Sequence, residues 1–150
     1  MKDQLKQLLD KYKTVLFVGI GNVLKQDDGV GVYISQMIQE SDSIRSLTVE
    51  QSLENYIGKI NQLKPGALVF IDCLFFNEKP GYADIVSADE ILEHTTNTHN
   101  VSLKRIAEFF KMPVIIIGIQ PGSVRYGEGL TPKVLKAADE IIKKINALKK

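Results

Sequence analysis

The sequence of 150 residues contains one cysteine, Cys73, and no tryptophan. A single cysteine excludes an internal disulfide bond and a zinc site built from several cysteines, and it is typical of a reducing compartment. An excess of charge is missing too, because 19 Lys and Arg residues face 18 Asp and Glu residues, for a net charge of +1. We therefore expect neither a nucleic acid nor a membrane surface as partner, since both are bound by strongly basic surfaces.

Long hydrophobic runs are absent as well. The longest strongly apolar stretch, residues 113–119, is far shorter than the roughly 20 residues of a membrane-spanning helix. Residues 1–13 mix charges and lack the apolar core of a signal peptide. Together with a composition of 44% hydrophobic and 25% charged residues, these features predict one globular domain over residues 1–150. We expect it to be a cytoplasmic monomer.

Short apolar runs rich in β-branched residues alternate with amphipathic helical segments along the chain. Buried strands are predicted at residues 14–18, 47–50, 67–72 and 114–118. Helical spacing of apolar residues is found at 5–12, 30–38, 56–63, 103–110 and 131–148. Alternation of this kind is typical of a parallel sheet that is covered by helices on both faces.

One further strand, at residues 82–87, follows the third strand after only a short loop. A parallel crossover needs a dozen or more residues and usually a helix, so this strand is predicted to run antiparallel at an edge. The sequence therefore predicts an α/β fold with three layers. Its centre is a five-stranded, mostly parallel sheet with one antiparallel edge strand, and helices cover both faces.

Polar residues follow several of the predicted strands, at the edge where α/β sheets bind ligands. Asp28 lies on the first crossover, Asp72 at the tip of the third strand, and His99 where a loop enters a helix. Two carboxylates and an imidazole would suit nickel, zinc or a similar divalent ion. Gly29 and Gly31 would then let something approach the first helical turn closely.

A dinucleotide site is the alternative at the same sheet edge. Gly19 and Gly21 match the first two glycines of the phosphate-binding pattern, and Glu50 ends the second strand where a ribose-binding acid belongs. Leu24 stands in place of the third glycine, however, and acidic residues follow where phosphate would bind. This alternative implies a non-enzymatic domain with a nucleotide-binding or regulatory role.

Plain structural roles also remain open for these residues. Asp27 and Asp28 have the positions of a helix cap and a first-turn acid, and Asp72 could cap a loop. His99 together with Asn100 could cap the following helix.

Nucleophilic catalysis finds little support. Cys73 has no histidine partner at a recognisable spacing and is interpreted as a small core residue. No serine stands in a nucleophile elbow. His94, the other histidine, has no assigned role.

The order of short motifs resembles that of the hydrogenase maturation proteases, and most of all the members that serve formate-hydrogenlyase-type hydrogenases. The motifs are GIGNVLKQDDGVGV at 19–32, a strand that ends in Asp72, THN at 98–100, GIQP at 118–121 and LTP at 130–132. This resemblance implies an endopeptidase that removes a C-terminal extension from the precursor of a nickel-iron hydrogenase large subunit. Nickel, supplied by that precursor, would be what the protease recognises.

The resemblance also implies that Asp28, Asp72 and His99 contact the metal. In our mechanistic hypothesis, Asp28 activates water while nickel polarises the peptide carbonyl. In a close variant, Asp28 and Asp72 form an aspartic-protease-like catalytic dyad and His99 only positions the substrate. Asp27 is given a capping role. The chain departs from the family at Glu50 and Gln51, where relatives often have a glycine-rich turn.

Overall fold

The computed structural model describes residues 1–94 and 97–148 and is built on one β-sheet. Its strands are β1 (Val15–Ile20), β2 (Ile44–Glu50), β3 (Ala67–Cys73), β4 (Ala83–Ser87) and β5 (Val114–Ile119). They lie in the order β2-β1-β3-β5-β4. All neighbours pair in parallel except β4, which runs antiparallel to β5 at the edge. The predicted sheet and its antiparallel edge strand are confirmed.

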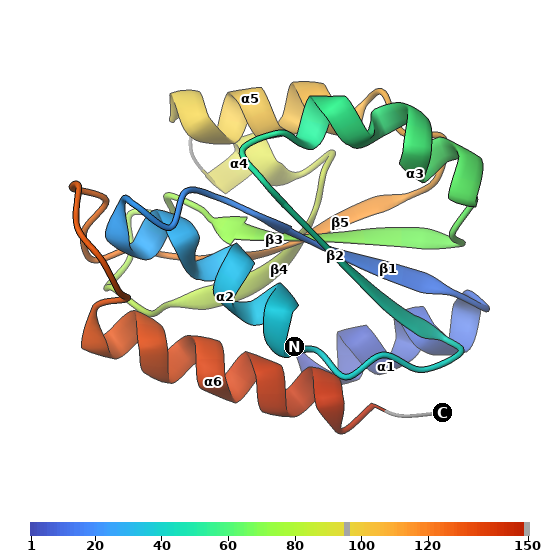
Figure 1. The fold of residues 1–150 in the computed structure, drawn as a ribbon, viewed down its shortest axis with the longest axis horizontal. Helices are drawn as coiled ribbons and strands as arrows, with labels where there is room; N and C mark the ends of the chain where they lie inside the picture. Colours follow the sequence, from blue (N-terminus) through green and yellow to red (C-terminus); the bar gives the residue numbers. More distant parts are fainter. Residues whose placement is uncertain (95–96, 149–150) are drawn as a thin grey trace.

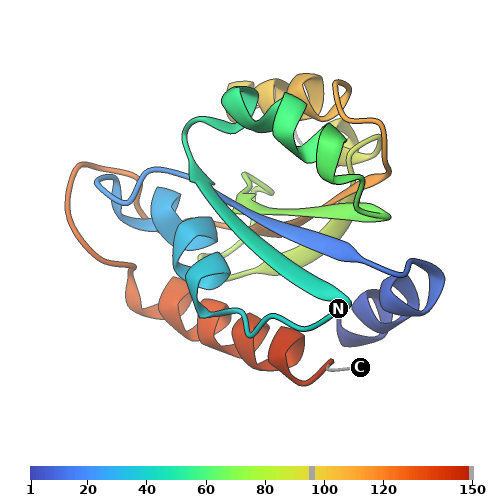
Figure 2. The ribbon, with the colours of Figure 1, turned by 45° about the vertical axis from the view of Figure 1, so that its right-hand side comes forward.

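Helices cover both faces of this sheet (Figure 1). The α-helices are α1 (Lys2–Lys11), α2 (Val30–Met37), α3 (Ile57–Leu63), α4 (Ile91–His94), α5 (Thr98–Ala107) and α6 (Pro132–Asn146), and two short 3-10 helices are η1 (Gln26–Gly29) and η2 (Leu53–Tyr56). Figures 1 and 2 show α1, α2 and α6 on one side of the sheet and α3, α4 and α5 on the other. The predicted three layers are therefore present.

The central strands β1 and β5, and β3 up to Asp72, are apolar along their length because each of their faces meets a helical layer. In β1, Phe17 packs into the core beneath α2 and α6, whereas its neighbour Val18 packs into the core beneath α3 and α5. In β3, Ile71 and Phe70 divide in the same way. Successive side chains of a strand point to opposite faces, so two covered faces require an uninterrupted apolar run.

The parallel strands bring the candidate site residues to one edge. The carboxyl ends of β1, β3 and β5 lie together at the left of Figure 1, where α2, α5 and α6 also begin. Asp28 in η1 follows β1, Asp72 is the penultimate residue of β3, and His99 is the second residue of α5. This is the edge at which open α/β sheets bind ligands.

The glycines of the first crossover serve the packing of the chain on itself. A Cβ atom on Gly31 would lie 1.9 Å from the carbonyl oxygen of Ile71 and 2.4 Å from that of Ile20. A Cβ atom on Gly29 would lie 2.8 Å from the Cα of Val23. The expectation that these glycines leave room for a ligand is thus wrong, because the sheet and the preceding turn occupy that room.

No helix among residues 1–94 and 97–148 is long and apolar enough to span a membrane.

We expect Gly31→Ala to lower the free energy of unfolding by about 3 kcal/mol, because α2 must move off the sheet to admit the methyl group. Gly58→Ala is the matched control, since a Cβ atom on Gly58 in α3 meets nothing within 4 Å. That change should raise the free energy of unfolding by up to about 1 kcal/mol. Urea denaturation measures both, and a Gly31→Ala protein as stable as the wild type would contradict the packing described.

Candidate active site

The end of β3 carries the closest contact between predicted site residues. Oδ2 of Asp72 lies 3.0 Å from Nε2 of His99, although the two residues are 27 positions apart in the chain. The other carboxylate oxygen of Asp72 accepts a hydrogen bond from the backbone N–H of Cys73 at 2.8 Å. Asp72 is completely buried, whereas the His99 side chain keeps 31% of its surface exposed. The imidazole therefore separates a buried carboxylate from solvent.

The beginning of α5 holds His99 in this position. Asn97 caps the helix, because its side-chain oxygen accepts a hydrogen bond from the His99 N–H at 2.9 Å. Asn100 is buried and holds the loop after β3 instead, bonding both the N–H and the carbonyl of Phe75 at 3.4 Å. The Phe75 ring then meets the imidazole edge to face, with centroids 5.9 Å apart. A capping role for His99 with Asn100 is thus wrong.

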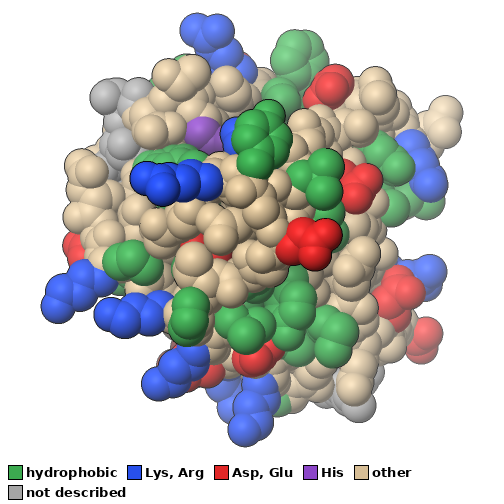
Figure 3. Space-filling model, turned by 60° about the vertical axis from the view of Figure 1, so that its left-hand side comes forward, with side chains coloured by type: hydrophobic (Ala, Val, Ile, Leu, Met, Phe, Trp, Pro, Cys, Tyr) green, Lys and Arg blue, Asp and Glu red, His purple; other side chains and the backbone are tan. Residues whose placement is uncertain are grey.

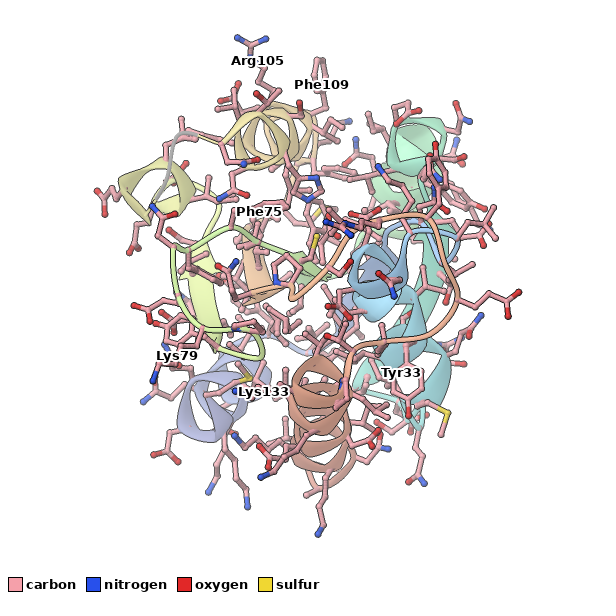
Figure 4. The ribbon with its side chains drawn as sticks, turned by 90° about the vertical axis from the view of Figure 1, so that its left-hand side faces the viewer. Tyr33, Phe75, Lys79, Arg105, Phe109 and Lys133 are labelled. Atoms are coloured by element: carbon pink, nitrogen blue, oxygen red, sulfur yellow. The ribbon has the colours of Figure 1, made fainter. Side chains whose placement is uncertain are left out.

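Asp28 approaches the same pair from η1. Its Oδ2 accepts a hydrogen bond from the backbone N–H of Asn22 at 3.0 Å, and its Oδ1 accepts one from the thiol of Cys73 at 3.3 Å. Asp28 is half-buried, and its charge acts on both Asp72 and His99. Figure 4 looks onto this edge of the sheet, with Phe75 at its rim. The fold thus gathers Asp28, Asp72 and His99 around Cys73.

The pKa values of the pair follow from burial and from this clustering. Burial and the Asp28 charge raise the pKa of Asp72, the contact with His99 offsets part of the increase, and the net pKa is about 6. Burial lowers the pKa of His99, but the hydrogen bond to Asp72 and the charges of Asp72 and Asp28 outweigh it, so the net pKa is raised. The pair thus combines a carboxyl group that ionises less readily than usual with an imidazole that keeps its proton more readily than usual.

Cys73 lies closer to Asp72 and His99 than its sequence context indicates. Its sulfur and ligand atoms of Asp72 and His99 all lie within 4.8 Å of one another, so the inference that it has no histidine nearby is wrong. Burial, and then the charges of Asp72 and Asp28, hold the pKa of this thiol well above its ordinary value. Cys73 is therefore protonated, and it serves as a core residue and hydrogen-bond donor. The side chain of His94 lies outside the described residues.

The donor set suits a divalent cation. The oxygen of Asp72 and the ring nitrogen of His99 that face each other are of the kinds that bind nickel or zinc, and their ligand atoms and the Cys73 sulfur lie within 4.8 Å of one another. Asp28 is not part of this group, and its Oδ1 lies 3.3 Å from the Cys73 sulfur. The protonated thiol of Cys73 is a poor ligand by comparison, because the thiolate is the form that binds metals.

Comparison with known proteins shows the family to which the chain with this site belongs. The sequence profile of the HycI hydrogenase maturation protease family matches residues 51–148. A putative hydrogenase maturation protease of Methanocaldococcus jannaschii is 30% identical over 135 residues, which cover 81% of this chain and 80% of the relative. The chain belongs to the hydrogenase maturation protease family. It is therefore a hydrolase of the endopeptidase class.

Other relatives agree with this family. The hydrogenase 3 maturation protease of Escherichia coli K12 is 25% identical over 138 residues, which cover 88% of each chain. The crystal structure of the [NiFe] hydrogenase maturation protease HycI from Thermococcus kodakarensis KOD1 has the same fold, with a TM-score of 0.82, 24% identity and 97% of each chain covered. These relatives are proteases, so the alternative of a nucleotide-binding regulatory domain finds no support in them.

Asp27 has a larger structural role in this protease than a helix cap. It is fully buried, and no side chain caps η1 or α2. Its carboxylate instead accepts hydrogen bonds from the N–H groups of Gly122, Ser123 and Thr131, at 2.8, 3.0 and 2.7 Å, and from the Thr131 hydroxyl at 2.6 Å. The predicted capping role is wrong. Asp27 clamps the loop between β5 and α6 onto η1.

Gln120 of the GIQP motif is a residue to which the sequence alone assigns no role. Its side-chain oxygen accepts hydrogen bonds from the N–H groups of Phe76 and Glu78, at 2.6 and 3.4 Å. It thereby fixes the loop that follows Asp72. Only the position after the last parallel strand could have suggested such a role.

The turn after β1 is filled by the protein itself rather than left open for a phosphate. Gly21 has a φ of +139°, and a Cβ atom there would lie 1.9 Å from the carbonyl oxygen of Asp28. The backbone N–H of Gly21 donates to the carbonyl of Glu50 at 2.9 Å. Glu50 is exposed and has a φ of +54°, a conformation that favours glycine.

We expect Asp27→Asn to lower the free energy of unfolding by about 2 to 3 kcal/mol, because one amide cannot accept the four hydrogen bonds that the carboxylate accepts. Thr131→Val removes only the hydroxyl bond and should cost about 1 kcal/mol. Chemical denaturation of both variants checks the clamp. Equal losses in the two variants would show that the carboxylate is not its centre.

We expect Asp72→Asn to raise the stability of the metal-free protein at pH 7.5 by about 1 to 3 kcal/mol. Unfolded Asp72 ionises near the ordinary aspartate pKa of 3.8, but folded Asp72 ionises only near pH 6, so ionisation costs the folded state above that pH. The advantage of the variant should therefore shrink as the pH falls from 6 towards 4. Denaturation at several pH values tests this, with the exposed Asp42→Asn as control. A pH-independent difference would contradict it.

Proposed function

We propose that this protease removes the C-terminal extension from the precursor of a nickel-iron hydrogenase large subunit, once nickel has been inserted into that precursor. The observation that carries the proposal is the contact between buried Asp72 and half-exposed His99, with Asp28 beside them, at the ligand-binding edge of the sheet. Family membership supplies the class of reaction, and this cluster supplies the groups for a metal-bearing substrate.

In the proposed reaction, the nickel is part of the substrate and the protease meets it through Asp28, Asp72 and His99. The side chain of His99 is more exposed to solvent than that of Asp72, so His99 makes the first contact with the nickel. The buried carboxylate of Asp72, whose pKa is about 6, then binds in its ionised form. Nickel held at this edge would polarise the carbonyl of the peptide bond next to it.

Asp28 is the proposed general base. Its carboxylate takes a proton from water as the water oxygen attacks the polarised carbonyl carbon, and Asp28 then gives this proton to the leaving amine as the C–N bond breaks. Asp28 suits this role because it is only half-buried and is held by Asn22 and Cys73 rather than by a cation. Cys73, buried and protonated, keeps the carboxylate oriented.

A dyad of Asp28 and Asp72 is the variant of this mechanism, with His99 as a positioning residue. The raised pKa of Asp72, about 6, fits a carboxyl group that shares a proton with a neighbour. The direct partner of Asp72 is His99 rather than Asp28, however, and this supports the metal-centred mechanism.

The experiment is incubation of the protein with candidate large-subunit precursors, with and without nickel, followed by mass spectrometry. We expect cleavage only of the nickel-loaded precursor. Asp28→Asn, Asp72→Asn and His99→Ala should each lower the rate at least about 100-fold, because each removes a group that contacts the reacting centre. His94→Ala is the matched control for the histidine variant and should process the precursor at the wild-type rate.

The two mechanisms differ in the effect of His99→Ala. A metal-centred site predicts losses of similar size for His99→Ala and Asp72→Asn, whereas the dyad predicts a far smaller loss for His99→Ala. Normal processing by Asp28→Asn would remove Asp28 from either mechanism.

A further inference from the structure

Exposed apolar side chains gather beside the active site. Four of the large apolar residues that are exposed among the described residues, Val23, Leu24, Tyr126 and Leu135, come from the turn before η1, the loop between β5 and α6, and the start of α6. Tyr126 is 84% exposed and Leu24 is 61% exposed. We refer to these four residues as the rim surface. An exposed apolar patch of this kind is typical of a protein interaction site.

The rim surface is joined directly to Asp28. The backbone N–H of Asn22 donates to the Asp28 carboxylate at 3.0 Å, and the side-chain oxygen of Asn22 accepts from the N–H of Leu24 at 3.0 Å. The N–H of Gly127 in turn donates to the carbonyl of Leu24 at 2.9 Å, which brings Tyr126 to the same edge. One short network therefore links the proposed base to the two most exposed residues of the rim.

A groove of about 400 Å³ continues the rim surface away from the site. Val23 and Leu135 line it together with Leu130 and Tyr33, and Gly29, the residue after Asp28, forms part of its wall. Figure 4 shows Tyr33 on the side of α2 that faces α6, below the loop between β5 and α6. Figure 3 shows hydrophobic side chains on the same face as the exposed histidine. A polypeptide that passes Asp28 can thus continue over apolar surface.

The rim is also held rigidly. Asp27 clamps the loop between β5 and α6 through four hydrogen bonds, and the N–H of Gln26 donates to the carbonyl of Gly127 at 3.1 Å. Lys25 lies over the Tyr126 ring, 5.7 Å from its centroid. Exposed apolar side chains on a braced loop lose little conformational freedom when a partner covers them, so they can contribute strongly to affinity.

We propose that the rim surface binds the hydrogenase large-subunit precursor through an apolar polypeptide segment next to the bond that is cleaved. The proposal rests on the proposed function, because the substrate of an endopeptidase extends beyond its reacting bond. Continuity with the site favours the precursor over other occupants: the rim shares its backbone and hydrogen bonds with the turn that carries Asp28. Side chains of the segment cover Tyr126 and Leu24 and enter the groove.

The test uses the full-length protein and the nickel-loaded precursor. We expect the double variant Leu24→Glu, Tyr126→Glu to raise KM roughly tenfold or more while kcat stays within about twofold of the wild type. A change in KM alone is expected because these side chains lie outside the reacting centre. Met37→Glu and Leu63→Glu are the matched controls, since both residues are exposed and apolar but lie outside the rim surface. Both controls should keep the wild-type KM.

Binding is measured in parallel by calorimetry, with Asp28→Asn added to the wild-type and rim-variant sequences to prevent cleavage. A roughly tenfold weaker affinity of the rim variant supports the proposal. Equal affinity and equal KM of the rim variant and the wild type overturn the proposal. It is also overturned if the wild type self-associates in sedimentation and the rim variant does not, because the rim surface would then be a contact between copies of this chain. If the wild type cleaves no precursor, this result counts against the proposed function alone. The calorimetric measurement still reports whether the rim surface binds the precursor.

Discussion

The candidate active site depends on the burial of one carboxylate, that of Asp72, beneath one imidazole. Burial in the apolar sheet makes ionisation of Asp72 unfavourable, and the raised pKa of about 6 expresses that cost. His99 offsets part of it through a contact of 3.0 Å. In the reaction that we propose, the nickel of the substrate would bind both groups at once.

The loops around that pair are braced by buried polar side chains that do no chemistry. Asp27, Asn100 and Gln120 each accept or donate hydrogen bonds to backbone groups of a loop that borders the site. The adjacent residues Asp27 and Asp28 consequently have different roles. The Asp27 carboxylate accepts the hydrogen bonds that hold the loop between β5 and α6, whereas the Asp28 carboxylate faces Asp72 and His99. A rigid frame of this kind suits an enzyme that must place one peptide bond of a large substrate.

The fold and the candidate residues were predictable because their signals are local. Continuous apolar runs, helical spacing and a short loop before residues 82–87 predict the layers and the antiparallel edge, and motif order predicts the family. Predictions failed where a role depends on a distant partner. In the sequence Asp27 resembles a helix cap, but in the structure it accepts a hydrogen bond from Thr131, which is 104 positions away. In the sequence Gly31 suggests room for a ligand, but in the structure the carbonyl of Ile71 occupies the space beside its Cα.

The alternation of strands and helices, and the positions at which carboxylates and an imidazole follow the strands, can be read from the chain alone. The folded structure is needed to show that Asp72 and His99 touch, that Cys73 lies beside them as a buried thiol, and that exposed Leu24 and Tyr126 border Asp28. The two kinds of property differ in the distance along the chain over which they arise. Backbone conformation and apolar periodicity are set by near neighbours in the chain, whereas burial, pKa and shared hydrogen bonds arise only when distant segments meet.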